Sequence, residues 1–91
     1  MYYSVQVITA KRHRAPKQYF IVEWNNETCS FEYQRTQITK KMVFFYTGAR
    51  QINLYYCQSI ADRLNWNMIS FPELVKLNQD ENIYNSENIF F

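Results

Sequence analysis

Residues Tyr19–Arg35 read Tyr-Phe-Ile-Val-Glu-Trp-Asn-Asn-Glu-Thr-Cys-Ser-Phe-Glu-Tyr-Gln-Arg, and the other segments of the chain can be arranged around this stretch. Two runs rich in aromatic and β-branched residues, which are typical of strands, flank the pair Asn25-Asn26. A two-residue hairpin loop needs positive φ at both central positions, and asparagine tolerates this better than any residue except glycine. The stretch therefore predicts a β-hairpin whose loop is Asn25-Asn26.

This loop also decides which side chains share a face of the hairpin. It places Val22 opposite Cys29, and successive side chains of a strand point to opposite faces. Tyr19 and Ile21 are then expected on the outer, exposed face. The expected inner face is apolar and consists of Phe20, Val22, Cys29, Phe31 and Tyr33.

Two further segments have strand-like patterns. Tyr2–Ala10 alternates apolar and polar residues, and antiparallel pairing with the hairpin would bring Val7 near Phe20. Met42–Tyr46 is apolar throughout, and its content of Val, Phe and Tyr favours a fourth strand that ends at Gly48. The alternative for this segment is a helix that is capped by Thr36 or Thr39 and stopped by the glycine.

The second half of the chain has a helical pattern. Within Ala49–Trp66 the apolar residues recur at steps of three and four, so a long helix is expected to cover the apolar face of the sheet. Ser70 and Glu73 form a capping box that begins a second, short helix. The expected inward residues of the long helix are Ile52, Tyr56, Cys57, Ile60, Ala61 and Leu64.

These elements together predict an α+β fold: an antiparallel sheet of three to four strands, one long helix packed on one face, and a short C-terminal helix. A chain of 91 residues makes a single domain, 1–91. Residues 1–48 are expected to be mostly strand and residues 49–79 mostly helix, while residues 80–91 form a tail or an edge strand.

Charge is distributed unevenly. Residues 1–50 hold eight Lys and Arg against three Glu, a net charge of +5, whereas residues 51–91 hold two against five, a net charge of −3. No apolar run reaches the roughly 18–20 residues that a membrane span needs, and the chain opens with no basic-then-apolar leader. Cys29 and Cys57 could meet in the core, but two cysteines without a secretory signal predict free thiols and a cytoplasmic protein, in the host cell's cytoplasm if a phage encodes it.

The most suggestive functional feature is the basic loop between the first two strands. Its fixed positive charges can neutralise phosphates, and the release of counterions then contributes to binding. The sequence therefore predicts a non-catalytic protein that binds nucleic acid or a nucleoprotein. The candidate residues are Lys11, Arg12, His13, Arg14 and Lys17, joined by Arg35, Lys40 and Lys41 if the end of the hairpin folds near the loop.

The alternative function is that of a small protein inhibitor or adaptor, of the kind that phages or immunity systems encode. It would block a host protein through exposed aromatic residues and an apolar tail. A homodimer formed through a free sheet edge is compatible with both functions. The candidate contact residues are Tyr19, Ile21, Ile89, Phe90 and Phe91.

Catalytic and cofactor motifs are missing from the sequence. The single histidine leaves no His/Cys spacing for zinc, and one glycine cannot build a phosphate-binding loop. A cysteine nucleophile would need His13 beside it, yet the histidine lies in the loop and both thiols are expected to point inward. The sequence thus predicts no enzyme, no metal and no cofactor.

Ile60–Phe71 resembles the core of a helix-turn-helix. Ala61 would allow two helices to approach closely, Asn65 would form the left-handed turn and Phe71 would anchor the second helix. The resemblance implies a DNA-reading helix, but Pro72 would then fall inside that helix.

Overall fold

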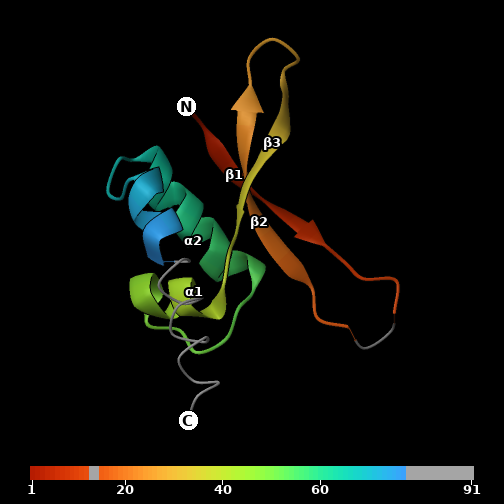
Figure 1. The fold of residues 1–91 in the computed structure, drawn as a ribbon, viewed down its shortest axis with the longest axis vertical. Coiled ribbons are helices and arrows are strands. Elements are labelled where there is room, and N and C mark those ends of the chain that lie inside the picture. The colour runs from red at the N-terminus through yellow and green to blue at the C-terminus, as the bar shows by residue number, and fades with distance from the viewer. Residues whose placement is uncertain (13–14, 78–91) are drawn as a thin grey trace.

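The computed structural model describes residues 1–12 and 15–77 of the chain. They form the predicted α+β fold, in which a three-stranded antiparallel sheet is followed by three helices and α2 packs on the sheet (Figure 1). The strand order is β1-β2-β3, the order of the chain. The elements are β1 (Tyr3–Ile8), β2 (Gln18–Asn25), β3 (Ser30–Gln37), α1 (Lys40–Thr47), α2 (Leu54–Asn65) and a helix at 71–77.

The predicted hairpin between β2 and β3 is present, but its loop is longer than expected. Four residues, 26–29, connect the strands, because the Asn25 side chain accepts a hydrogen bond from the Glu27 N–H at 2.9 Å and the Asn25 carbonyl accepts one from the Cys29 N–H at 2.8 Å. Cys29 has a φ of 55°, so it takes the left-handed conformation that was expected of asparagine. The predicted pairing of Cys29 with Val22 is therefore wrong.

The helices cover the face of β2 opposite to the predicted one, because β1 pairs with β2 one residue away from the predicted register. Val5 pairs with Ile21 and Val7 with Tyr19, so these side chains point together toward the helices. Ile21 has no solvent exposure and Tyr19 is 8% exposed. The predicted exposure of Tyr19 and Ile21 is wrong, because a register change of one residue moves a side chain to the other face.

Two residues predicted to face inward are in fact exposed. Phe31 lies opposite Trp24 and keeps 39% of its surface exposed, and Tyr33 is exposed as well. Two irregularities in the pairing of β2 with β3 leave Glu32 and Arg35 without a partner residue on β2. Bulges of this kind bend the edge strand β3 and disturb the regular row of groups with which another strand could pair.

Residues Met42–Tyr46 belong to a helix, α1, and the predicted fourth strand is wrong. The Thr39 hydroxyl accepts a hydrogen bond from the Met42 N–H at 3.2 Å, and Gly48 ends the helix with a φ of 78°. Met42 and Val43 are fully buried, whereas Phe44 and Phe45 are exposed. The apolar run therefore has a buried and an exposed side in one helix. The alternative prediction, a helix capped by Thr39 and stopped by Gly48, is confirmed.

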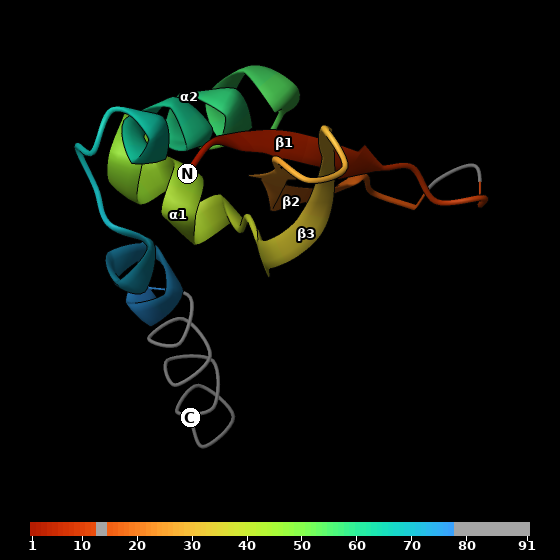
Figure 2. The same ribbon diagram turned by 90° about the horizontal axis from the view of Figure 1, so that it is seen from above.

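Helix α2 confirms the expected helix over the sheet. Asn53 caps it by accepting the Tyr56 N–H at 3.0 Å. The Asn65 side chain bonds both backbone groups of Tyr3, accepting its N–H at 2.7 Å and donating to its carbonyl at 2.9 Å, so the end of α2 is attached to the edge of β1. Figure 2 shows the described helices gathered on one side of the sheet. The buried residues of α2 are Cys57, Ile60, Ala61 and Leu64.

The helix at 71–77 begins where the capping box predicted. The Ser70 hydroxyl accepts the Glu73 N–H at 3.3 Å, and Leu74 is fully buried. The left-handed residue before this helix is Asn67, with a φ of 57°, and not Asn65 as the helix-turn-helix resemblance implied. Pro72 lies in the first turn of this helix, where it is tolerated.

The two cysteines do not form a disulfide with each other. Cys29 is exposed in the hairpin loop and Cys57 is buried on α2, so both thiols are free. Within residues 1–12 and 15–77, no helix is long and apolar enough to cross a lipid bilayer. The predicted tail over 80–91, which includes Ile89, Phe90 and Phe91, lies outside the described residues, as do His13 and Arg14.

Candidate anion-binding cleft

The basic loop connects the adjacent ends of β1 and β2. Lys11, Arg12 and Lys17 are exposed there. The Arg12 carbonyl accepts the Ala15 N–H at 3.3 Å, which closes a turn within the loop. Pro16 has no backbone N–H to donate, so the regular pairing of β1 with β2 begins only at Gln18.

A cleft of about 380 Å³ opens beside this loop, between the start of β2, the start of α1 and the connection from α1 to α2. Lys17 comes from the loop, Lys40 is the first residue of α1 and Arg50 follows the glycine that ends α1. Three cationic residues from separate segments thus line one cavity, and no Asp or Glu among the described residues lines it. The lining residues are Pro16, Lys17, Tyr19, Lys40, Arg50, Gln51 and Ile52.

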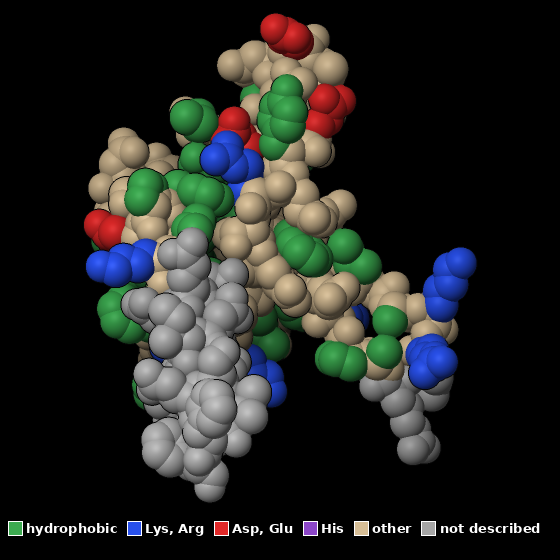
Figure 3. Space-filling model, in the orientation of Figure 1, with side chains coloured by type: hydrophobic (Ala, Val, Ile, Leu, Met, Phe, Trp, Pro, Cys, Tyr) green, Lys and Arg blue, Asp and Glu red, His purple; other side chains and the backbone are tan. Residues whose placement is uncertain are grey.

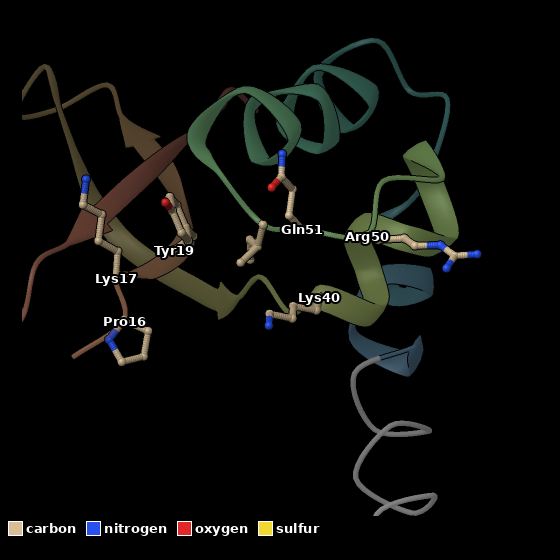
Figure 4. Close-up of a pocket in the computed structure, with 7 residues that line it drawn as sticks. Pro16, Lys17, Tyr19, Lys40, Arg50 and Gln51 are labelled. Carbon is tan, nitrogen blue, oxygen red and sulfur yellow. The ribbon is translucent and has the colours of Figure 1, made fainter. Parts of the chain in front are cut away.

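The side chains of the cleft have different orientations. In Figure 4, Lys17 and Tyr19 stand on the β2 side, and the Lys40 side chain extends toward that side from α1. The Arg50 guanidinium points away from them, toward solvent. Lys17 and Lys40 therefore contribute positive charge from two sides of the cleft, while the guanidinium of Arg50 adds positive potential from farther away.

The sequence-predicted basic residues are only partly brought together. Lys17 and Lys40 share the cleft, and Lys11 and Arg12 lie in the adjoining loop. Arg35 lies elsewhere: it forms an ion pair with Glu23, and its guanidinium carbon lies 4.5 Å from the centre of the Phe71 ring. Because these partners hold Arg35 on the helix-facing side of the sheet, its predicted place beside the loop is wrong.

Lys41 and Arg50 also differ from the predicted site. Lys41 is half-buried at the second position of α1 and does not line the cleft, in contrast to the prediction that it joins the site. Arg50 was missed by the sequence analysis. Gly48 was the sequence feature that could have indicated Arg50. A helix that ends at a glycine lets the chain turn back, which would bring Arg50 to the cleft, whereas a strand that ends there does not predict this turn.

Two acidic residues, Glu27 and Glu32, lie at the opposite end of the sheet. β2 has eight residues and is therefore about 26 Å long, and its far end leads into the loop that carries Glu27 and precedes Glu32. Figure 3 shows acidic side chains at the tip of this hairpin and basic side chains beside the loop at the other end of the sheet. Hydrogen bonds from Asn25, Thr28 and Ser30 lower the pKa of Glu32, which favours its charged form. The sheet thus has a positive and a negative end.

The polar side chains that line the cleft in the described part of the chain are those of Lys17, Tyr19, Lys40, Arg50 and Gln51. Burial raises the pKa of the Cys57 thiol to about 12, which keeps it protonated at neutral pH. Within the described ranges, no group of three His, Cys, Asp or Glu side chains could hold a metal ion. The positive charges of this lining can attract an anion, and Tyr19 and Ile52 add apolar surface to the same cavity.

No protein-family model matches the chain, and the searches of curated proteins and of solved structures give no significant match.

Proposed function

We propose that the protein is a non-catalytic, cytoplasmic binding protein that engages nucleic acid or a nucleoprotein through its basic end. The observation that carries this proposal is the convergence of Lys17 and Lys40 on a cleft whose described lining has no acidic residue. Lys11 and Arg12 extend the same positive surface along the loop. Surfaces of this kind bind the phosphate backbone, so sequence preference is expected to be weak.

The positive and negative ends of the sheet are expected to orient the protein relative to a polyanion as the two approach. A polyanion is attracted to the loop and repelled by Glu27 and Glu32 at the hairpin tip, so the loop leads as the two molecules approach. Tyr19 and Ile52, which line the same cleft, allow part of a sugar or base to be covered while the lysines attract the phosphate. The proposed contact residues are Lys11, Arg12, Lys17 and Lys40.

The experiment measures binding of single- and double-stranded DNA and RNA at about 50 mM and about 200 mM salt. Four phosphate contacts give a fall in affinity of about 50-fold for a single strand and about 150-fold for a duplex over this range. Lys17→Glu is expected to weaken binding at least tenfold and to reduce the salt dependence. Lys76→Glu, at an exposed lysine outside the cleft, is the control with the same change in net charge.

Two results would contradict the proposal. One is tight binding with little salt dependence, since phosphate contacts release counterions. The other is an equal loss of affinity in Lys17→Glu and Lys76→Glu, which would reduce the effect to net charge alone.

A second candidate function, a small inhibitor or adaptor that blocks a host protein, is favoured by a different observation. Phe45 on α1 and Tyr55 on α2 are strongly exposed, the latter at 78%, and exposed aromatic residues are typical anchors of protein interfaces. A pull-down from the host with and without nuclease separates the two functions. A protein partner that survives nuclease and is lost in Tyr55→Ala, but not in Lys17→Glu, would support the inhibitor.

A further inference from the structure

The face of the sheet that points away from the helices has an apolar row along its central strand, β2, with polar side chains of β1 and β3 beside it. The side chains that alternate with Ile21 on β2 point to this face, and Val22 is buried there although it does not belong to the core under the helices. The described contacts of α1 and α2 involve each other and the helix-facing side, and Figure 2 shows no described helix over the opposite face. The open face consists of Tyr2, Ser4, Gln6, Ile8, Gln18, Phe20, Val22, Trp24, Phe31, Gln34 and Gln37.

Aromatic rings form a cluster on this open face. The rings of Trp24 and Phe31 lie 4.9 Å apart edge to face, and the ring of Tyr2 lies 5.7 Å from that of Phe31. Tyr2 is 54% exposed. Beside the cluster, the Gln34 amide donates to the Gln6 side-chain oxygen at 3.0 Å, which links β3 to β1 across β2. The face is therefore a preformed surface with exposed rings at the end near the hairpin tip.

The charges around the open face are positive at one end of the sheet and negative at the other. Lys11 and Arg12 lie beyond the end at which β1 passes into the loop, and Glu27 and Glu32 lie at the end with the hairpin tip. Glu23, the acidic residue of β2, points to the helix-facing side, where it forms an ion pair with Arg35. The face itself is neutral, with a positive end and a negative end.

We propose that this open face binds the same face of a second copy of the chain, with the two copies related by a two-fold axis and their β2 strands antiparallel. In this arrangement the basic loop of each copy meets the acidic hairpin tip of the other. A two-fold interface uses the same surface twice, so every favourable contact between loop and tip occurs twice. The aromatic clusters of the two copies, together with the neighbouring apolar side chains, then form the part of the interface from which water is excluded.

A second copy fits this face better than a nucleic acid does. The exposed rings of Tyr2 and Phe31 lie at the end near Glu27 and Glu32, where a phosphate backbone is repelled. The acidic tip is instead complementary to Lys11 and Arg12 of another copy. The cleft with Lys17 and Lys40 opens beside Tyr19, whose side chain faces the helices, so the cleft stays accessible in the dimer. The dimer does not depend on the proposed function, but it occupies Lys11 and Arg12, so the dimer presents Lys17 and Lys40 to a phosphate backbone.

The size of the face sets the expected strength. Three strands about 4.8 Å apart and about 26 Å long present a projected area on the order of 370 Å². A standard stable interface buries about 800 Å² per partner, so the face alone provides about half and the two pairs of loops must add the rest. The expected dimer is therefore weak, with a Kd on the order of micromolar, and it weakens as salt rises.

The first experiment is sedimentation velocity on the full chain across micromolar to millimolar concentrations. The wild type is expected to pass from monomer to dimer, and Phe31→Ala to raise the Kd at least tenfold. Tyr55→Ala, which removes an exposed ring from α2, is the matched control and is expected to dimerise as the wild type does. Circular dichroism of each variant confirms that it is folded.

The second experiment exchanges the charges. Lys11→Glu, Arg12→Glu and Lys17→Glu together make both ends of the face negative, and Glu27→Lys with Glu32→Lys makes both ends positive. Each variant alone is expected to be monomeric at concentrations where the wild type dimerises, while an equal mixture forms a heterodimer. This recovery requires loop and tip to meet between copies.

Four outcomes would overturn the proposal: a wild type that stays monomeric at millimolar concentration, a Phe31→Ala variant that dimerises normally, a charge-exchange mixture that stays monomeric, or oligonucleotide binding that quenches Trp24 in a monomer. The last would assign the open face to nucleic acid instead.

Discussion

On the helix-facing side of β2, Ile21 is completely buried, whereas on the opposite side of the same sheet Phe31 keeps 39% of its surface exposed. Both faces carry aromatic and β-branched residues at alternating positions, so composition alone does not distinguish them. They differ in what covers them. One face is closed by α2, and the other presents aromatic rings to solvent. The pairing of β1 with β2 decides which residues lie under the helices, since it sets Val5 and Val7 beside Ile21 and Tyr19.

The strongest test of this difference compares one substitution on each face. Ile21→Ala is expected to lower the free energy of unfolding by about 2–5 kcal/mol, because it leaves a cavity under the helices. Phe31→Ala is expected to cost less than about 2 kcal/mol in the monomer, since the ring already contacts water. Urea unfolding at low protein concentration measures both, and a larger loss for Phe31→Ala would reverse the assignment of the faces.

The attachment of α2 to β1 gives the next largest expected effect. Asn65→Ala removes both partners of the Tyr3 backbone and is expected to lower the free energy of unfolding by about 1–3 kcal/mol. Gln58→Ala is a suitable control, because that amide on α2 donates only to the Asp62 side chain, at 3.1 Å, in the described structure. Equal losses in the two variants would show that the Tyr3 contacts carry no special weight.

Burial on the helix-facing side also predicts a loss of stability in alkali. Because burial raises the pKa of Cys57 to about 12 from an ordinary value of 9.0, the unfolded chain loses this proton at a lower pH than the folded chain. The stabilisation is fully present below pH 9 and declines as pH rises toward 12, by about 1.4 kcal/mol per pH unit.

Unfolding of the wild type and of Cys57→Ala across this pH range isolates the contribution of the thiol. The curve of the variant is expected to be flatter than that of the wild type, because alanine has no proton to lose. Parallel curves for the wild type and Cys57→Ala would show that the thiol is not shielded from water.

The smallest expected effect concerns the end of α1. Gly48 has a φ of 78° with no atom near the position of an added Cβ, so Gly48→Ala strains only the backbone. The expected loss is about 1 kcal/mol, and Gly48→Asn should lose less, because asparagine tolerates the left-handed region. If the alanine variant is as stable as the wild type, the helix does not end as described.

Part of this structure could be predicted from sequence because some signals are local. The three- and four-residue spacing of Cys57, Ile60 and Leu64 placed α2 on the sheet, and the Ser70 cap placed the next helix. The hairpin was predictable as well, but its loop length was not. That length depends on the Asn25 side chain bonding the Glu27 N–H, which competes with the two-residue turn that the asparagine pair favours.

The candidate site was predictable only in part for the same reason. Lys17 stands out in the basic loop, but its neighbour Lys40 reaches the cleft because α1 begins there. The apolar run over Met42–Tyr46 suits a strand as well as a helix, and packing decided between them. Arg50 could not be placed without knowing that α1 is a helix. The sequence therefore revealed the charges, while the contacts between elements set their arrangement.

The most direct measurement of the register is the reactivity of the two native thiols toward a colourless thiol reagent that releases a dye. This register leaves Cys29 exposed in the hairpin loop, while Cys57 is buried on the sheet-facing side of α2. One thiol per folded chain is therefore expected to react at once and to disappear in Cys29→Ser, with the second reacting only on unfolding. Two slow thiols in the folded chain would instead place Cys29 on the inner face opposite Val22, and would contradict the separation of the sheet into a covered and an open side.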